Sequence, residues 1–297
     1  MTFVPHAQGL AYAASVAVLW GVFLFYLKRH FSDYPPALVI VVTNIFSVGW
    51  FLTAVSLDPG RTVVREVVAL PADDWLAAAG VVVVFASGLL LLYHALAVGD
   101  VSYVAPLSKL SPAFVLPLEV VVLDQHLGPI QVAGVLIATV AVYVANYQGG
   151  GIHTPFQTAV TSRPARLALL SAMLLGVVAV SQRVLLQEGG VQPAVWTLIK
   201  LAGVPIVLGP VAWRGRTPRV WGDLGKFAVA GAFVGLGEWV TALAFSTIPA
   251  SLASPIISMQ AVVAVVLGGI ILGEEDLLLR LVAAGTAVVG VVLIALG

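Results

Sequence analysis

Long apolar runs follow one another along almost the whole chain, separated by short stretches that contain charges, prolines or glycines. The runs are continuous and rich in Ala, Leu, Val and Gly, and they lack the alternation of strands in a membrane barrel. Because about 20 helical residues cross a bilayer core ~30 Å thick, each run predicts a transmembrane helix. Ten spans are expected, near residues 9–28, 36–57, 74–98, 101–123, 128–147, 166–187, 193–213, 223–246, 250–272 and 277–296.

The composition fits this class of protein. Of the 297 residues, 60% are hydrophobic and 9% are charged, whereas soluble domains carry about 25% charged residues. The formal net charge is zero and cysteine is absent, so we expect no nucleic-acid partner, no disulfide framework and no thiol-based metal site. Residues 1–9 lack the positive charges of a signal peptide, so the first apolar run is expected to remain as a span.

A polar, glycine-rich linker divides the predicted spans into two sets of five. We place it at 148–165, between a first unit at 1–147 and a second at 166–297. An odd number of spans in each unit would insert the second unit in the opposite direction, as in transporters that work by alternating access. Three local similarities indicate related units: Gly21 and Lys28 with Gly176 and Arg183, Pro106 with Pro255 at an offset of 149 residues, and Ala133 and Gly134 with Ala284 and Gly285.

Three groups of residues are typical of a known family: Leu19, Trp20 and Gly21 with Lys28, then Tyr93 to Leu96, then Ala242 to Leu272 leading into Gly273 and Glu274. On these residues, and over nearly its whole length, the chain resembles an EamA-type member of the drug/metabolite transporter superfamily. The resemblance implies an all-α membrane protein of ten helices, built as two inverted five-helix repeats around a central cavity, that exports or imports small metabolites. The chain departs from the family's pattern at Asp124 and Gln125, where Gly-Glu is usual, and at Ala261, where Pro is frequent.

Ionisable side chains inside the predicted spans are candidates for function. Each costs several kcal/mol at the bilayer centre unless it faces a cavity or a partner. Arg183 and Glu119 lie near span ends, where a charged side chain reaches the interface, so a structural role is favoured for both.

Lys109 and Glu238 lie deeper, and for these two we favour a role in transport. Lys109 is the expected partner of an anionic substrate group, and Glu238 is the proton-coupling candidate. For Lys200, substrate binding and pairing with a helix terminus are equally open. His94 is more often a packed core histidine than a proton carrier.

Prolines interrupt the span near 101–123 and its counterpart near 250–272. A proline removes a helical hydrogen bond and bends the backbone, and interrupted helices at matching places in two halves indicate a transporter's binding site. We therefore expect the cavity between these spans; the alternative is that serines only satisfy the freed carbonyls. The residues concerned are Pro106, Pro112 and Pro117 with Ser108 and Ser111, and Pro249 and Pro255 with Ser251, Ser254 and Ser258.

Two tryptophans lie deeper than those at the predicted span ends. Trp239 adjoins Glu238 and could stack on flat organic substrates, whereas ordinary packing is favoured for Trp20. The full set of expected substrate-binding residues is Ser108, Lys109, Ser111, Ser254 and Ser258 of the bent spans, with Trp20, His94, Lys200, Glu238 and Trp239 of the others.

These features predict a secondary transporter that exports small organic metabolites, such as amino acids or related solutes, by alternating access. The chain has no Gly-rich phosphate loop of the Walker type, and we expect neither an enzyme nor a cofactor. One alternative is a flippase for a lipid-linked substrate. An intramembrane enzyme is a weaker alternative, because the five histidines show no metal-ligand spacing. The expected setting is a prokaryotic inner membrane, with a monomer favoured and proton coupling left open.

The orientation has two conflicting indications. Nine Lys and Arg residues lie on one side of the predicted spans and two on the side of the termini, which by the positive-inside rule places the termini outside the cytoplasm. The family resemblance implies cytoplasmic termini instead. The nine are Lys28, Arg29, Arg163, Arg166, Arg214, Arg216, Arg219, Lys226 and Arg280, and the two are Arg61 and Arg65.

Overall fold

The structure is a computed structural model, and helices are the only regular structure in the part of the chain that it describes. This part comprises residues 3–57, 62–108, 110–111, 114–115, 117–118, 128–130, 132–134, 136–137, 140, 161–248, 250–271 and 277–296. Lys109 and Glu119, two of the predicted functional candidates, lie outside it.

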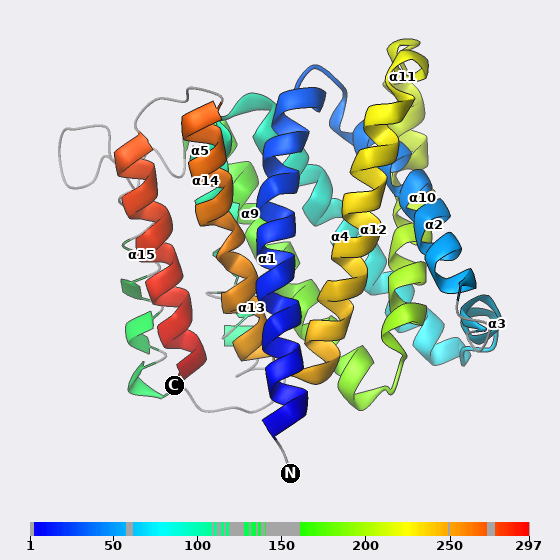
Figure 1. Cartoon of the computed structure of the whole chain (residues 1–297), viewed down its shortest axis with the longest axis horizontal. Coiled ribbons are helices and arrows are strands. Elements are labelled where there is room, and N and C mark those ends of the chain that lie inside the picture. The colour runs from blue at the N-terminus through cyan, green and yellow to red at the C-terminus, as the bar shows by residue number, and fades with distance from the viewer. Residues whose placement is uncertain are drawn as a thin grey trace.

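The helices fall into two groups along the chain (Figure 1). Those of the first half are α1 (Phe3–Phe31), α2 (Pro36–Ser56), α3 (Val63–Val68), α4 (Ala72–Val98) and α5 (Val101–Ser108). Those of the second half are α9 (Arg163–Arg183), the π-helical η1 (Val184–Glu188), α10 (Pro193–Arg214), α11 (Arg219–Gly222), α12 (Leu224–Thr247), α13 (Ala250–Ser258), α14 (Gln260–Ile271) and α15 (Leu277–Leu296). Proline stands in the first turn of α2, α9 and α10, where its missing N–H group leaves no helical hydrogen bond unmade.

Six of the described helices are long and apolar enough to cross a membrane. They are α1 from Ala7 onward, α2, α4, α9 together with η1, α10 and α12. The other four predicted spans correspond to α5, to α13 with α14, to α15, and to residues 128–147, most of which lie outside the described part. An integral membrane protein is therefore shown, and the count of ten spans stays a prediction.

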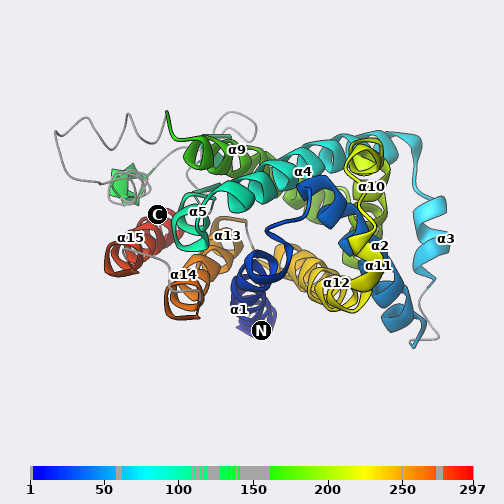
Figure 2. The same ribbon diagram turned by 90° about the horizontal axis from the view of Figure 1, so that it is seen from above.

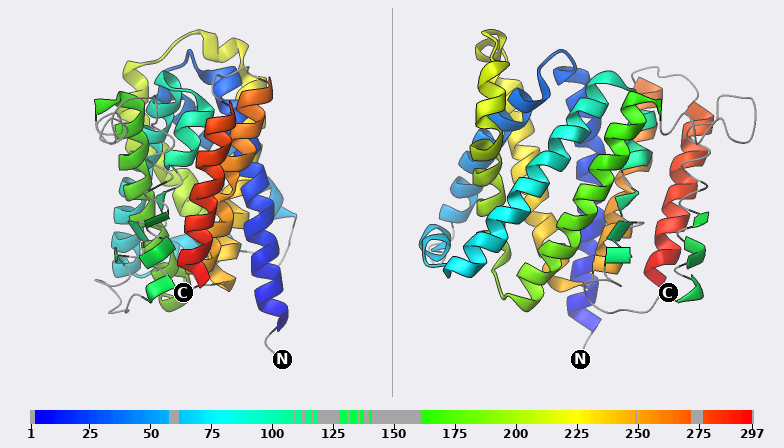
Figure 3. Two further views of the ribbon diagram at one scale, coloured as in Figure 1. Left: turned by 90° about the vertical axis from the view of Figure 1, so that its left-hand side faces the viewer. Right: turned by 180° about the vertical axis from the view of Figure 1, so that it is seen from behind.

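The two halves interlock. Seen from above, α4 and α9 lie along one side of the bundle and α1, α12 and α14 along the other (Figure 2). The first helix of each half packs against the opposite half, α1 on α12, α13 and α14, and α9 on α4 and α5. Both termini lie at one end of the bundle, where α1 begins, whereas α9 begins at the other end (Figure 3). The first helices of the two halves thus run in opposite directions.

Matching glycine contacts relate the halves residue by residue. Gly88 of α4 packs against Leu175 of α9, and Gly237 of α12 packs against Trp20 of α1. The offset between matching positions is 155 residues for α1 and α9, 157 for α2 and α10, and 149 for α4 and α12 and the segments that follow them. Positions related in this way are called equivalent below. Two further pairs of contacts match in the same way. Gly203 contacts Val82, and their equivalents Phe46 and Gly231 also contact each other. Gly176 contacts Ser111, and their equivalents Gly21 and Gln260 also contact each other.

A polar contact at the end of the bundle opposite the termini joins the loop after α1 to the start of α12. The Tyr34 hydroxyl donates a hydrogen bond of 2.6 Å to Asp223 Oδ2, and Lys226 Nζ lies 2.7 Å from Asp223 Oδ1. Burial, helped by the hydrogen bond to the Asp223 carboxylate, raises the pKa of Tyr34 to about 12. The hydrogen bonds from Lys226 and Tyr34 lower the pKa of Asp223. The Asp223 carboxylate therefore stays charged and the Tyr34 hydroxyl stays protonated across the neutral range.

Candidate functional site

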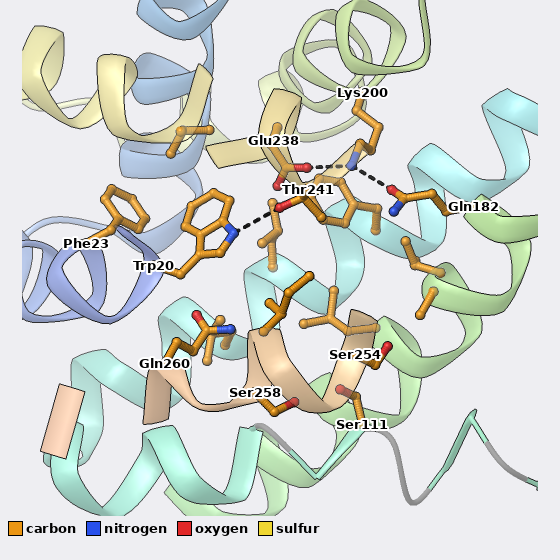
Figure 4. Close-up of a pocket in the computed structure, with 18 of the residues that line it drawn as sticks. Trp20, Phe23, Ser111, Gln182, Lys200, Glu238, Thr241, Ser254, Ser258 and Gln260 are labelled. Carbon is orange, nitrogen blue, oxygen red and sulfur yellow. Dashed lines mark hydrogen bonds and ion pairs between the residues drawn. The ribbon is translucent and has the colours of Figure 1, made fainter. Parts of the chain in front are cut away.

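A cavity lies between the two halves, lined by side chains from α1, α2, α4, α9, α10, α12, α13 and α14 (Figure 4). Its volume is about 160 Å³. Since a cavity of ~150 Å³ holds a benzene molecule, this one admits a small organic group. Most of its wall is apolar, with a few polar side chains pointing inward. Such a wall is typical of small-molecule binding sites.

A buried ion pair forms the charged part of the wall. Lys200 of α10 pairs with the carboxylate of Glu238 of α12, and the two residues are only 2% and 7% exposed. Lys200 Nζ also donates a 2.9 Å hydrogen bond to Gln182 Oε1, which accepts a second, 2.8 Å bond from the indole of Trp196. The network thus joins α9, α10 and α12 in the second half.

The surroundings explain how two charges can lie inside an apolar bundle. Each ion loses several kcal/mol of hydration when buried, and only close pairing with further hydrogen bonds offsets that loss. Lys200 has both, because it binds Glu238 and Gln182 and its ammonium lies 5.1 Å from the ring centre of Phe85 and 5.4 Å from that of Trp196. Contact with the aromatic faces further favours the cation.

Trp20 of α1 forms another part of the wall in a fixed orientation. Its indole N–H donates a 3.2 Å hydrogen bond to the Thr241 hydroxyl, and its ring meets Phe23 edge to face at 5.6 Å between ring centres. Because the polar edge of the indole is bound, the cavity wall here is a largely apolar aromatic surface.

The predicted substrate-binding residues divide into two groups. Those that line the cavity are Trp20, Ser111, Lys200, Glu238, Ser254 and Ser258. Three others lie elsewhere in the structure. The Ser108 hydroxyl bonds the Ala105 carbonyl at 2.9 Å, His94 Nδ1 lies 3.0 Å from the Leu90 carbonyl oxygen, and the Trp239 ring packs edge to face on Phe51.

Several lining residues were not predicted, chiefly Asn44, Phe85, Tyr93, Gln182, Thr241 and Gln260. The uncharged polar residues among them stand inside apolar runs, as Gln182 does, and that isolation is the signal that could have identified them. Gln260 has a second signal, because it is equivalent to Ser111.

The cavity wall follows the symmetry of the two halves in position but not in chemistry. Seven pairs of equivalent residues line it: Trp20 and Leu175, Phe23 and Val178, Leu24 and Ala179, Phe85 and Val234, Leu89 and Glu238, Leu92 and Thr241, and Ser111 and Gln260. The ion-pair network has no charged counterpart, because the residues equivalent to Lys200, Glu238 and Gln182 are Thr43, Leu89 and Leu27. Charge is thus confined to the second-half side of the described wall.

Among the described residues, no group of three or more His, Asp or Glu side chains is arranged to hold a metal ion. The fold and the cavity define an integral membrane protein of apolar helices around an internal, partly charged site. The EamA-like transporter family matches residues 7–147 and 164–296. The chain therefore belongs to the EamA-like transporter family, and the resemblance noted in the sequence is confirmed.

The chain is similar to a solved structure described as "Crystal structure of protein". The similarity has a TM-score of 0.65 and covers 96% of this chain and 97% of the other, at 15% sequence identity. At this identity the likeness shows the fold alone. A search of curated proteins finds no match.

Proposed function

We propose that the protein is a secondary transporter that carries small organic metabolites, such as amino acids or related solutes, out of the cell by alternating access. The single observation that supports this most is the cavity between the two halves, with the Lys200–Glu238 ion pair buried in its wall. A charge pair inside an apolar bundle is costly, and cavities with polar groups at the junction of two repeats are typical of transporters.

The proposal includes ten spans in two inverted five-span units, 1–147 and 166–297, joined by the linker 148–165. The opposite directions of α1 and α9 and the matching glycine contacts support this arrangement. The proposed transport unit is a monomer, in a prokaryotic inner membrane.

The wall suggests how a substrate would lie. A carboxylate of the solute would bind the Lys200 ammonium, and an amino group of the solute would bind the Glu238 carboxylate. A solute that carries both groups would therefore replace the Lys200–Glu238 ion pair with two ion pairs to the protein. The apolar part of the solute would lie along Trp20 and Phe85, which line the cavity. Lys109, the partner of an anionic group predicted from the sequence, stays a candidate beside Lys200, because its equivalent residue, Ser258, lines the cavity.

Glu238 is the proposed proton-coupling group. A proton on its carboxylate removes the charge that would hold a substrate's amino group, so the proton and the substrate compete for Glu238. Because each weakens the binding of the other, the two binding equilibria depend on each other. This dependence is the linkage that coupled transport requires.

The experiment begins with thermal unfolding of the purified protein against amino acids, nucleotides, sugars and cationic drugs. A ligand at 100 times its Kd stabilises the folded state by about 2.7 kcal/mol, so a binding class is visible as a raised Tm. The expected result is a shift with small zwitterionic solutes. A shift with none of the classes would contradict the proposal, and exposure of lipid headgroups in liposomes then tests the flippase alternative.

Transport of the binding solute into liposomes then tests the coupling. Glu238→Gln is expected to abolish the pH dependence of transport, because the amide cannot take up the coupling proton. Ser87→Ala is the matched control, since this exposed hydroxyl on α4 bonds only its own helix, at 2.8 Å to the Val83 carbonyl. Unchanged pH dependence in Glu238→Gln would remove Glu238 as the coupling group.

A further inference from the structure

The turn between the third and fourth span of each half leads directly into the cavity wall. In the first half, Gly99 and Asp100 separate α4 from α5, and Ser111 follows on the cavity wall. In the second half, two residues separate α12 from α13, and Gln260 follows as the equivalent wall residue. The position of each turn therefore sets the position of the wall residues that come after it.

A side chain from the first helical segment of the same half holds each turn. Lys28 Nζ at the end of α1 donates to the carbonyl oxygens of Leu96 and Gly99, both at 2.9 Å. Gln187 Nε2 in η1 donates to the carbonyl oxygens of Phe245, at 2.8 Å, and Ile248, at 3.2 Å. The four acceptors form two equivalent pairs, because each residue of the second pair follows its counterpart by 149 positions.

This equivalence differs from the one that sequence spacing predicted. Lys28 follows Gly21 by seven residues, as Arg183 follows Gly176, which paired Lys28 with Arg183. The contacts instead pair Lys28 with Gln187, which is four residues further along. The four residues that follow Arg183, up to Gln187, lie in the π-helical η1 that continues α9.

At both sites a side chain satisfies carbonyl groups at the end of a helix. The last carbonyl groups of a helix have no partner within the helix and carry the negative end of its dipole. Inside a membrane an unsatisfied carbonyl is costly. The three donors of the lysine ammonium and the two of the glutamine amide can each satisfy two carbonyls at once.

We propose that Lys28 and Gln187 are positioning residues that play the same part in the two halves. Each fixes the turn between the third and fourth span of its own half and thereby sets the position of the cavity wall that this half supplies. This inference concerns the scaffold and does not depend on which solute the protein carries.

The test uses the absence of cysteine from the chain. Ser111→Cys and Gln260→Cys place single reporters at equivalent positions of the cavity wall, one in each half. Each is combined with Lys28→Met or Gln187→Met, which keep an unbranched side chain but remove the donors. The measurement is the rate at which 2-aminoethyl methanethiosulfonate modifies each cysteine in the purified protein.

The expected result is specific to each half. Lys28→Met changes the rate at Ser111→Cys by about fivefold or more and leaves Gln260→Cys within about twofold; Gln187→Met does the reverse. Lys226→Met, a lysine outside the cavity wall, is the matched control and changes neither rate. If Lys28→Met does not fold, the Gln187→Met arm gives the same test in the second half, where no charge is removed. Equal changes at both reporters, or none at either, would overturn the proposal.

Discussion

The two sides of the cavity are built alike but carry different chemistry. On the second-half side, Lys200 and Glu238 form an ion pair held by Gln182. In the first half, the equivalent residues are Thr43, Leu89 and Leu27, none of which is charged, and of these three Leu89 alone lines the cavity. The helices around both sets make matching contacts, since Gly203 meets Val82 where Gly231 meets Phe46.

The repeat therefore supplies the shape of the site, and single substitutions supply its chemistry. A cavity with charge on one side alone orients an amphipathic solute, because the polar end gains only at the charged side and the apolar end only at the other.

Removing the cation should cause the largest loss of stability. Lys200→Met leaves Glu238 buried without its partner, and loss of one member of a buried ion pair costs about 3–5 kcal/mol. The measurement is the free energy of unfolding in detergent. The double variant Lys200→Met with Glu238→Leu should regain most of that loss, since an apolar pair of similar size removes the buried charge altogether. A double variant as unstable as the single one would show that the unpaired charge is not the cause.

Alanine at the equivalent glycines Gly88 and Gly237 should act differently in the two halves. A Cβ at Gly237 would lie 2.7 Å from Trp20 Cζ2, and that indole is held by its bond to Thr241, so we expect a loss of about 1–3 kcal/mol. At Gly88 the nearest atom is Leu175 Cδ2 at 3.1 Å, the end of a flexible side chain. The gain in helix propensity from alanine, about 1 kcal/mol, should offset that contact. Unfolding of both variants under one condition measures the difference; equal losses would contradict it.

Tyr34→Phe should lower stability by about 1 kcal/mol at neutral pH, because it removes the hydrogen bond to Asp223. Since the pKa of Tyr34 is raised to about 12 from the ordinary 10.0, the bond contributes fully below pH 10 and is lost as the pH rises from about 10 to 12. The difference in Tm between wild type and Tyr34→Phe should therefore shrink over that range. A difference that is constant up to pH 12 would contradict the assignment.

Thr43→Val should have the smallest effect. The Thr43 hydroxyl is fully buried and has no hydrogen-bond partner among the described residues. Its replacement by a methyl group removes an unsatisfied polar group without changing the side-chain shape, so stability should stay within about 0.5 kcal/mol or rise. A clear loss of stability, measured as for Lys200→Met, would show that the first-half side depends on a polar contact after all.

The helical membrane class follows from the sequence because a long apolar run can satisfy its backbone hydrogen bonds inside a membrane in few structures other than a helix. Glu238 and Lys200 stood out for a physical reason, the cost of a charge inside an apolar run. Their pairing could not be predicted, since it requires α10 and α12 to meet at one particular height. The repeat was visible only as scattered matches, because few positions besides the close glycine contacts constrain the residue type.

The differences between the predicted and the observed site residues also have physical causes. Trp239 follows Glu238 directly, but neighbouring residues on a helix point about 100° apart, so one lines the cavity and the other packs on Phe51. The Ser108 hydroxyl donates a hydrogen bond to the Ala105 carbonyl of its own helix instead of facing the cavity. Serine side chains commonly form such local bonds to the backbone. Spacing matched Arg183 with Lys28, whereas the contacts that hold the two turns come from Lys28 and Gln187, and spacing alone cannot show such contacts.

The central claim is that two related halves enter the membrane in opposite directions and enclose the cavity between them. The most direct test is the sidedness of single cysteines at Asp33, just after α1, and at Glu188, the last residue of η1; both side chains are exposed. A membrane-impermeant thiol reagent applied to intact cells should label one of these cysteines at once and the other only after permeabilisation. Labelling of both from the same side would contradict the inverted arrangement.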